Sequence, residues 1–132
     1  MSKIPPEQEW FLQADYDLHT AKAMLRSKRY IYAVFLCHLA LEKALKGLVA
    51  ASTGEPPPRT HNLILLVKLA KPNLNHEQLT FLATLNTASI ATRYPQELAQ
   101  ALKQYDRKMT KSYIKSTEEV IKCLRQDPRL KQ

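Results

Sequence analysis

Apolar side chains recur every three or four residues along most of this chain, which is the spacing of one face of an α-helix. Pro5-Pro6, followed by Glu7 and Glu9, forms a good helix start, because rigid backbone and negative charge are both favoured in a first turn. A helix of about 20 residues is expected to follow. Its apolar positions are Trp10, Ala14, Leu18, Ala21 and Leu25.

A second helix is expected from about Tyr30 to Ala51, and it is apolar on several faces. Such a helix packs against more than one neighbour. We therefore predict that it is the central helix of a bundle, with a surplus face left for a partner in a dimer. Its heptad-like stripe is Tyr30, Val34, Cys37, Leu41, Ala44 and Leu48, with Ile31, Phe35 and Leu39 on the remaining surface.

The middle of the chain divides into a loop and two helices. Residues 52–60 (STGEPPPRT) cannot be helical, because consecutive prolines remove donors and exclude the α region before them. A short third helix is expected over about 62–71. A fourth should follow Asn75, whose side chain fits a capping box with that of Gln78, and should end before Arg93.

The C-terminal part is expected to be part turn and part helix over 96–105, then a clear helix over about 106–125 and a frayed tail over 127–132. No strand-like alternation of useful length is present. The chain is predicted to be a single all-α domain over 1–132, an up-and-down bundle of about five helices with its core at about 8–126. The expected inner face of the last helix is Met109, Tyr113, Ser116, Val120 and Leu124.

Positive charge is concentrated near the C-terminus. The net charge is +8, and residues 98–132 alone carry nine basic and four acidic side chains. A basic segment attracts phosphate, whether on nucleotides, nucleic acid or a membrane surface. The alternative is a solvated face with internal ion pairs, here Glu118 with Lys122 and Lys115 with Glu119. The candidate RNA-backbone face consists of Lys108, Lys111, Lys115, Lys122 and Arg125.

Several classes of site lack their sequence signals. Cys37 and Cys123 have no CxxC spacing and are expected to be buried thiols. The four histidines show no metal-ligand spacing, and two glycines cannot form a phosphate-cradling glycine-rich loop. No metal and no cofactor are expected. With no apolar run as long as a membrane span and no hydrophobic signal region, we expect no membrane association and a cytoplasmic location.

The polar side chains of the second helix form the first candidate site. His38, Glu42 and Lys46 are four residues apart, so they share one stripe of an otherwise apolar helix. One interpretation is a polar groove in which Lys46 meets phosphate, Glu42 orients it and His38 offers a donor or a proton. The other is an ion pair between Glu42 and Lys46, worth about 0.2–0.5 kcal/mol, beside a core histidine. Lys43 points away from this stripe.

Two further groups of residues could reach the same end of the bundle. Arg59 and His61 follow the proline run, where Arg59 could clamp phosphate and His61 could alternatively cap the third helix. Arg93 and Tyr94 lie where the fourth helix ends. An arginine fork suits bidentate phosphate recognition and a tyrosine can stack on a base. Their alternative role is structural, with Tyr94 under the bundle and Arg93 tied to a helix C-terminus or to a carboxylate such as Glu42.

Three stretches together resemble the HEPN family, the "higher eukaryotes and prokaryotes nucleotide-binding" domain. The stretches are WFLQADYDLHTAKAML, then AVFLCHLALEKALKGLVAASTGEPPPRTHNLILLVKLA, and finally ATRYPQE. The resemblance covers most of residues 8–126 and implies a helical bundle that is usually a homodimer. It also implies a possible partner, a minimal nucleotidyltransferase, in a toxin–antitoxin-like pair or a nucleotide-handling module.

The resemblance bears on catalysis as well. Many HEPN proteins are ribonucleases that use an arginine, four to six arbitrary residues and a histidine, and no arginine of this chain has a histidine at that spacing. The leading hypothesis is thus a non-catalytic module that binds a nucleotide or RNA phosphate. A rewired ribonuclease, in which Arg93 meets His38 or His61 in space, and a pure interaction module are the alternatives. The candidate binding residues are Glu42, Lys46, Arg59, His61, Arg93 and Tyr94.

Overall fold

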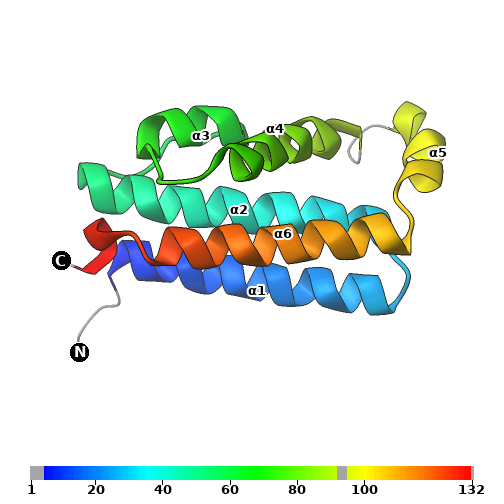
Figure 1. Ribbon diagram of the computed structural model, residues 1–132, viewed down its shortest axis with the longest axis horizontal. Helices are drawn as coiled ribbons and strands as arrows, with labels where there is room; N and C mark the ends of the chain where they lie inside the picture. Colours follow the sequence, from blue (N-terminus) through cyan, green and yellow to red (C-terminus); the bar gives the residue numbers. More distant parts are fainter. Residues whose placement is uncertain (1–4, 92–94, 132) are drawn as a thin grey trace.

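The computed structural model describes residues 5–91 and 95–131 as six α-helices and one short 3₁₀-helix (Figure 1). The described residues contain no β-strand, so the all-α prediction is confirmed, with one helix more than the five expected. The helices are α1 (Pro6–Arg26), α2 (Tyr30–Thr53), α3 (Leu63–Ala70), α4 (His76–Ala91), α5 (Pro95–Gln104), α6 (Arg107–Arg125) and the 3₁₀-helix η1 (Pro128–Lys131).

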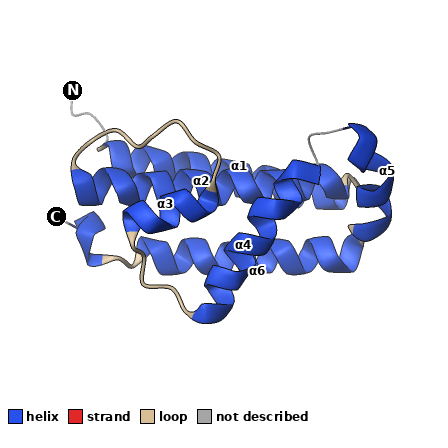
Figure 2. Ribbon diagram, turned by 90° about the horizontal axis from the view of Figure 1, so that it is seen from above, coloured by secondary structure: helices blue, strands red, loops and turns tan. Residues whose placement is uncertain are grey.

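Three long helices form the body of the molecule. α1 and α2 run antiparallel along most of their length, and α6 packs against both of them (Figure 1). α3 and α4 cover α2 on the side away from α1, and α5 lies at the end of the bundle where α6 begins. Seen from above, α6 lies on one side of the α1–α2 pair, and the loop after α2 crosses the opposite side (Figure 2).

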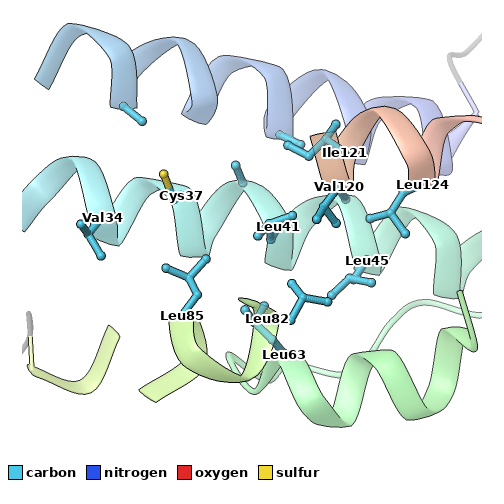
Figure 3. Close-up of a cluster of buried hydrophobic side chains, with 14 of the residues drawn as sticks. Val34, Cys37, Leu41, Leu45, Leu63, Leu82, Leu85, Val120, Ile121 and Leu124 are labelled. Atoms are coloured by element: carbon cyan, nitrogen blue, oxygen red, sulfur yellow. The ribbon is translucent and has the colours of Figure 1, made fainter. Parts of the chain in front are cut away.

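The hydrophobic core is centred on α2, as predicted for its many apolar faces. Leu41 and Leu45 are fully buried between α6 on one side and the leucines of α3 and α4 on the other (Figure 3), and Leu48 is also fully buried. Tyr32 is the one large apolar side chain of α2 that is mainly exposed among the described residues. The surplus face expected on this helix is therefore small, because α1, α3, α4 and α6 already cover most of it.

Small residues allow α1 and α2 to approach closely. Ala14 and Ala21 of α1 and Ala40 of α2 are completely buried. Gly47 of α2 also belongs to this contact, since a Cβ atom there would lie 3.0 Å from the Phe11 ring and 3.1 Å from the carbonyl oxygen of Glu7. A β-carbon at this position would push the helices apart, so the close packing depends on glycine.

The turn between α1 and α2 is a Schellman motif built on a lysine. The N–H of Lys28 donates to the carbonyl of Leu25 at 3.1 Å, and that of Arg29 donates to the carbonyl of Met24 at 2.8 Å. These two bonds require a left-handed residue between them, and Lys28 has a φ of 64°. Glycine is the usual residue here, because a side chain is strained in the left-handed region.

Polar side chains cap the N-termini of α4 and α6. The predicted capping box of α4 is confirmed: the Asn75 Oδ1 accepts from the Gln78 N–H at 2.8 Å, and the Gln78 Oε1 accepts from the Asn75 N–H at 3.0 Å. α6 begins after Asp106, whose Oδ1 accepts from the Met109 N–H at 2.8 Å. These local signals explain why the sequence indicates the helix starts.

Three expectations for the C-terminal part were wrong in detail. Residues 95–104 form the regular helix α5, and the expected frayed tail contains η1, where Arg129 binds Asp127 at 2.8 Å. The inner face of α6 is turned by about one residue from the expected one. Met109 is exposed, because threonine hydroxyls and β-branched side chains fill the contact with α2 instead. The buried residues of α6 are Thr110, Ile114, Thr117, Val120, Ile121 and Leu124.

Candidate functional site

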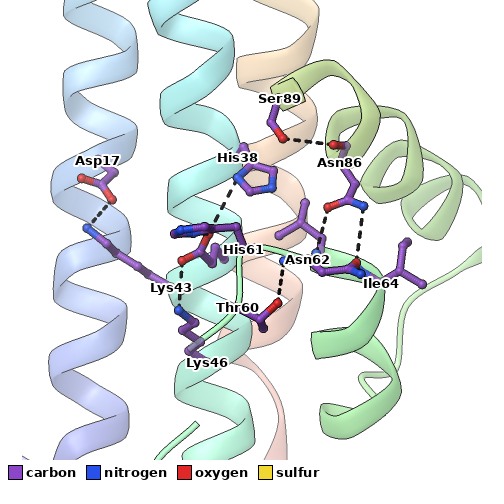
Figure 4. A network of polar contacts seen from close by, with 12 residues as sticks. Asp17, His38, Lys43, Lys46, Thr60, His61, Asn62, Ile64, Asn86 and Ser89 are labelled. Atoms are coloured by element: carbon purple, nitrogen blue, oxygen red, sulfur yellow. Dashed lines mark hydrogen bonds and ion pairs between the residues drawn. The ribbon is translucent and has the colours of Figure 1, made fainter. Parts of the chain in front are cut away.

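The polar stripe of α2 faces inward, where it meets the end of the proline-rich loop (Figure 4). His38, Glu42 and Lys46 are all buried. Burying a charged group is costly unless it is paired, so each of these charges needs a partner. The stripe predicted from the four-residue spacing is therefore present, and most of its side-chain surface is withdrawn from solvent.

Glu42 is at the centre of the cluster and uses both carboxylate oxygens. Its Oε2 accepts a hydrogen bond from the Lys46 Nζ at 3.0 Å, and its Oε1 lies 2.9 Å from the Nδ1 of His61. The Nδ1 of His38 is 3.9 Å from the same Oε1. One buried carboxylate therefore gathers one lysine and two histidines, and the predicted pair between Glu42 and Lys46 is confirmed.

His61 joins this buried cluster to solvent. Its side chain is 65% exposed, although its Nδ1 reaches the buried Glu42. An ionised carboxylate can only accept, so the Nδ1 of His61 is the donor, and the Nε2 is the nitrogen available to a ligand. A carboxylate that fixes one ring nitrogen and leaves the other free is the arrangement of histidines that bind phosphate or transfer protons.

Lys46 has a second neighbour that the sequence did not indicate. Its ammonium nitrogen lies 5.6 Å from the centre of the Trp10 ring on α1. A cation over an indole face is attracted by the ring's electrons. Lys46 is therefore held between Glu42 and Trp10. Because its side chain is buried, it contributes positive charge near Glu42 and is not an exposed clamp for phosphate.

The position of His61 follows from the way the loop ends. Gly54, with a φ of 71°, terminates α2, and the prolines carry the chain across to α3. Asn62 then caps α3, accepting from the N–H groups of Ile64 and Leu65 at 3.0 and 3.3 Å. The alternative in which His61 caps this helix is wrong, because the next residue does so and leaves the histidine free to reach Glu42.

Asn86 of α4 fixes the same junction from the other side. Its Oδ1 accepts from the Leu63 N–H at 2.9 Å, and its Nδ2 donates to the Asn62 Oδ1 at 3.4 Å (Figure 4). Thr60 also accepts from the Asn62 N–H, at 3.1 Å. Sequence reasoning missed Asn86, because nothing in its helical context signals a partner 23 residues away.

The remaining candidates are spread over other parts of the molecule. Arg59 is exposed on the loop two residues before His61. Arg93 and Tyr94 lie outside the described residues. Lys43, which points away from the stripe of His38, Glu42 and Lys46, forms an ion pair with the buried Asp17 of α1 at 2.7 Å.

The candidate basic face of α6 is divided by its contacts. Arg125 pairs with Asp15 of α1, and its guanidinium carbon lies 5.3 Å from the centre of the Phe11 ring. It therefore serves to hold α6 against α1. Glu118 pairs with Lys22 of α1 at 3.4 Å rather than with the expected Lys122.

The cysteines and the other acidic and histidine groups suggest no further reactive centre. Burial raises the pKa of the Cys37 thiol to about 12, so it is not a nucleophile near neutral pH. Cys123 is only half-buried, contrary to expectation, and its Sγ donates to the carbonyl of Asn73 at 3.5 Å. Over residues 5–91 and 95–131, no group of three or more His, Cys, Asp or Glu side chains could hold a metal ion.

None of the described helices combines the length and apolar character needed to cross a membrane.

Comparison with known proteins gives one family. Residues 7–127 match the family model described as the HEPN domain. The crystal structure of TT1696 from Thermus thermophilus is 23% identical, covering 92% of this chain and 98% of that chain with a TM-score of 0.79. The structure of ST0689, an archaeal HEPN homologue, is 20% identical over 92% of this chain and 97% of that chain, with a TM-score of 0.71. None of the curated proteins compared with the chain matches it.

Proposed function

The chain belongs to the HEPN family, and from this premise we propose that it is a binding module that holds a phosphate of a nucleotide or of RNA at His61. The observation that carries the proposal is the Glu42–His61 contact of 2.9 Å, which orients an exposed imidazole. In this account, the Nε2 of His61 contacts the phosphate and Arg59 of the adjoining loop adds a second positive charge.

The charges of the cluster favour an anion. Lys46 already neutralises Glu42, so a protonated His61 leaves the cluster with a net positive charge. The protonated ring donates from both nitrogens, one to Glu42 and the other to a phosphate oxygen.

We further propose that the module acts with a minimal nucleotidyltransferase as one half of a toxin–antitoxin-like pair. The support for this partner is the resemblance of the chain to HEPN proteins that accompany such enzymes. The helical module would then present a nucleotide or RNA end to the catalytic partner, and its own residues would bind without reacting.

A second candidate function is RNA cleavage, and one observation favours it. A histidine held by a carboxylate can act as a general acid or base, and His61 is held in this way by Glu42. The sequence lacks the arginine-to-histidine spacing of the family's ribonucleases, so catalysis would need the histidine to work with an arginine from elsewhere in the fold.

Replacement of His61 separates the two functions. In the wild type, we expect millimolar ATP, GTP or a short oligouridine to raise the melting temperature, because a ligand that binds only the folded state stabilises it. His61→Gln should remove the increase caused by ATP and GTP and leave the melting temperature of the free protein within a few degrees of the wild type. His76→Gln is the matched control, since His76 is an exposed histidine at the start of α4.

The outcomes are distinct. A melting temperature that none of the three ligands changes would contradict the binding function. Cleavage of single-stranded RNA without metal, lost in His61→Gln and kept in His76→Gln, would replace it with the ribonuclease.

A further inference from the structure

A groove separates the C-terminal half of α1 from the N-terminal half of α6, at the right-hand end of Figure 1. It has a volume of about 640 Å³. α6, which lines this groove, and the loop after α2, which leads to His61, lie on opposite sides of the α1–α2 pair (Figure 2). Its charged lining residues are Lys22, Arg26, Lys108, Lys111, Lys115 and Glu118.

Most of the positive charge in the groove is unbalanced. Glu118 is the one acidic residue among those that line it, and it is already paired with Lys22 at 3.4 Å. Arg26, Lys108, Lys111 and Lys115 form no ion pair with any described residue. Like charges gathered in a concave surface reinforce one another's potential and attract a polyanion.

The basic residues of the groove differ in part from the basic face that was predicted from α6 alone. Arg125 belongs to the contact with Asp15 and Phe11, and Lys122 does not line the groove. In their place α1 contributes Lys22 and Arg26, which the sequence pattern did not connect with α6. The candidate face is therefore made by two helices that are distant in sequence.

The cations stand in two facing rows. Lys22 and Arg26 are four residues apart on α1, and Lys108, Lys111 and Lys115 are three and four apart on α6. The rise of an α-helix puts successive members of a row about 4.5–6 Å apart along the helix axis and makes the longer row about 10 Å long. Packed helix axes lie about 8–10 Å apart, so the two rows can flank one strand of phosphates.

We propose that this groove binds the phosphodiester backbone of a single-stranded nucleic acid without reading its sequence. The lining contains no aromatic side chain on which a base could stack. Its apolar lining residues, Leu25 and Ile114, are aliphatic. The groove can therefore bind phosphates through charge, but it has few groups that could distinguish one base from another. The proposal goes beyond phosphate binding at His61, because it uses other residues.

The test measures fluorescence anisotropy of labelled 12-nucleotide oligouridine and oligothymidine against salt concentration. With up to four phosphates neutralised, the logarithm of the affinity should fall with the logarithm of salt with a slope of about −3 at most. Lys111→Gln/Lys115→Gln should weaken binding at low salt by roughly tenfold and make the slope shallower by about 1.4. Glutamine preserves the helix and the aliphatic stem.

Two further variants make the result specific. Lys68→Gln/Lys122→Gln removes the same charge from exposed positions outside the groove and should bind like the wild type. Lys111→Arg/Lys115→Arg keeps the charge and should bind as well as the wild type or better. Circular dichroism melts check that each variant is folded.

The proposal is overturned if Lys68→Gln/Lys122→Gln weakens oligonucleotide binding as much as Lys111→Gln/Lys115→Gln does, because binding would then depend on net charge alone. Tighter binding of a duplex than of the single strand, or equal binding of polyglutamate, would also overturn it. Comparison of oligouridine with oligothymidine tells RNA from DNA as the source of the backbone. Lys111→Gln/Lys115→Gln should keep the rise in melting temperature that ATP gives through His61, so failure at one site is distinguishable from failure at the other.

Discussion

At the scale of single residues, the decisive arrangement is the way Glu42 distributes its two oxygens. The sequence spacing predicted its bond to Lys46, because residues four apart meet on a helix. The bond to His61 joins positions 19 residues apart across a loop. No local pattern specifies such a contact, so the sequence named both residues as candidates and could not establish that they meet.

Stability should depend strongly on this pair. Glu42→Gln leaves the buried Lys46 without its counter-charge, and breaking a buried pair in this way costs about 3 kcal/mol of unfolding free energy. Glu42→Gln/Lys46→Met removes both charges and should recover most of that loss, because an apolar pair of similar volume needs no desolvation of charge. Urea denaturation of the three proteins measures both effects. If the unfolding free energy of Glu42→Gln lay within about 1 kcal/mol of the wild type, the pair would contribute no more than a weak surface ion pair.

At the scale of elements, the sequence indicates the helix ends better than the helix faces. Asn75, Gln78 and the proline run act within a few residues of themselves, so their effects on the backbone follow from sequence. The inner face of α6 depends instead on packing with α2, which buries Thr110 and Thr117. Because threonine is not counted as apolar, buried threonines interrupt the helical repeat of apolar residues that marks a buried face. The apolar pattern alone therefore does not give the orientation of α6.

The left-handed turn between α1 and α2 gives a prediction at this scale. Lys28→Gly should raise the free energy of unfolding by about 0.5–1 kcal/mol. Glycine removes most of the backbone strain at a φ of 64°. Its greater conformational freedom in the unfolded chain offsets part of this gain. Lys28→Ala is the control, since it removes the charge and keeps a β-carbon in the same conformation. Equal stability of the two variants would mean that the strain at this position is negligible.

At the scale of the whole molecule, the expected surplus face of α2 is largely covered, and other apolar side chains remain exposed. Tyr32 of α2 and Leu98 and Leu102 of α5 lie around one groove at the end of the bundle. Exposed apolar residues gathered in one place are typical of contact surfaces. The sequence predicted a dimer through the long helices, whereas the exposed apolar residues favour a contact surface at this end of the bundle.

We predict that the protein is a homodimer in solution. Light scattering across a concentration series should give twice the chain mass of 15.2 kDa. Leu102→Asp, which places a charge in the exposed cluster, should lower the mass to that of one chain, while Leu12→Asp on the exposed side of α1 serves as the control. A single-chain mass at every concentration would contradict the dimer. Native co-purification with mass spectrometry should in addition recover a small nucleotidyltransferase.

The proposed role of His61 as the contact for phosphate is tested most directly by proton NMR of its imidazole. The chain has four histidines, and the signal that is missing from the spectrum of His61→Gln is that of His61. Titration of the wild type with ATP or oligouridine should move this signal to a saturating value and leave those of the exposed His19 and His76 almost unchanged. A His61 signal that stays in place at millimolar ligand, or that moves no more than the exposed two, would contradict the account.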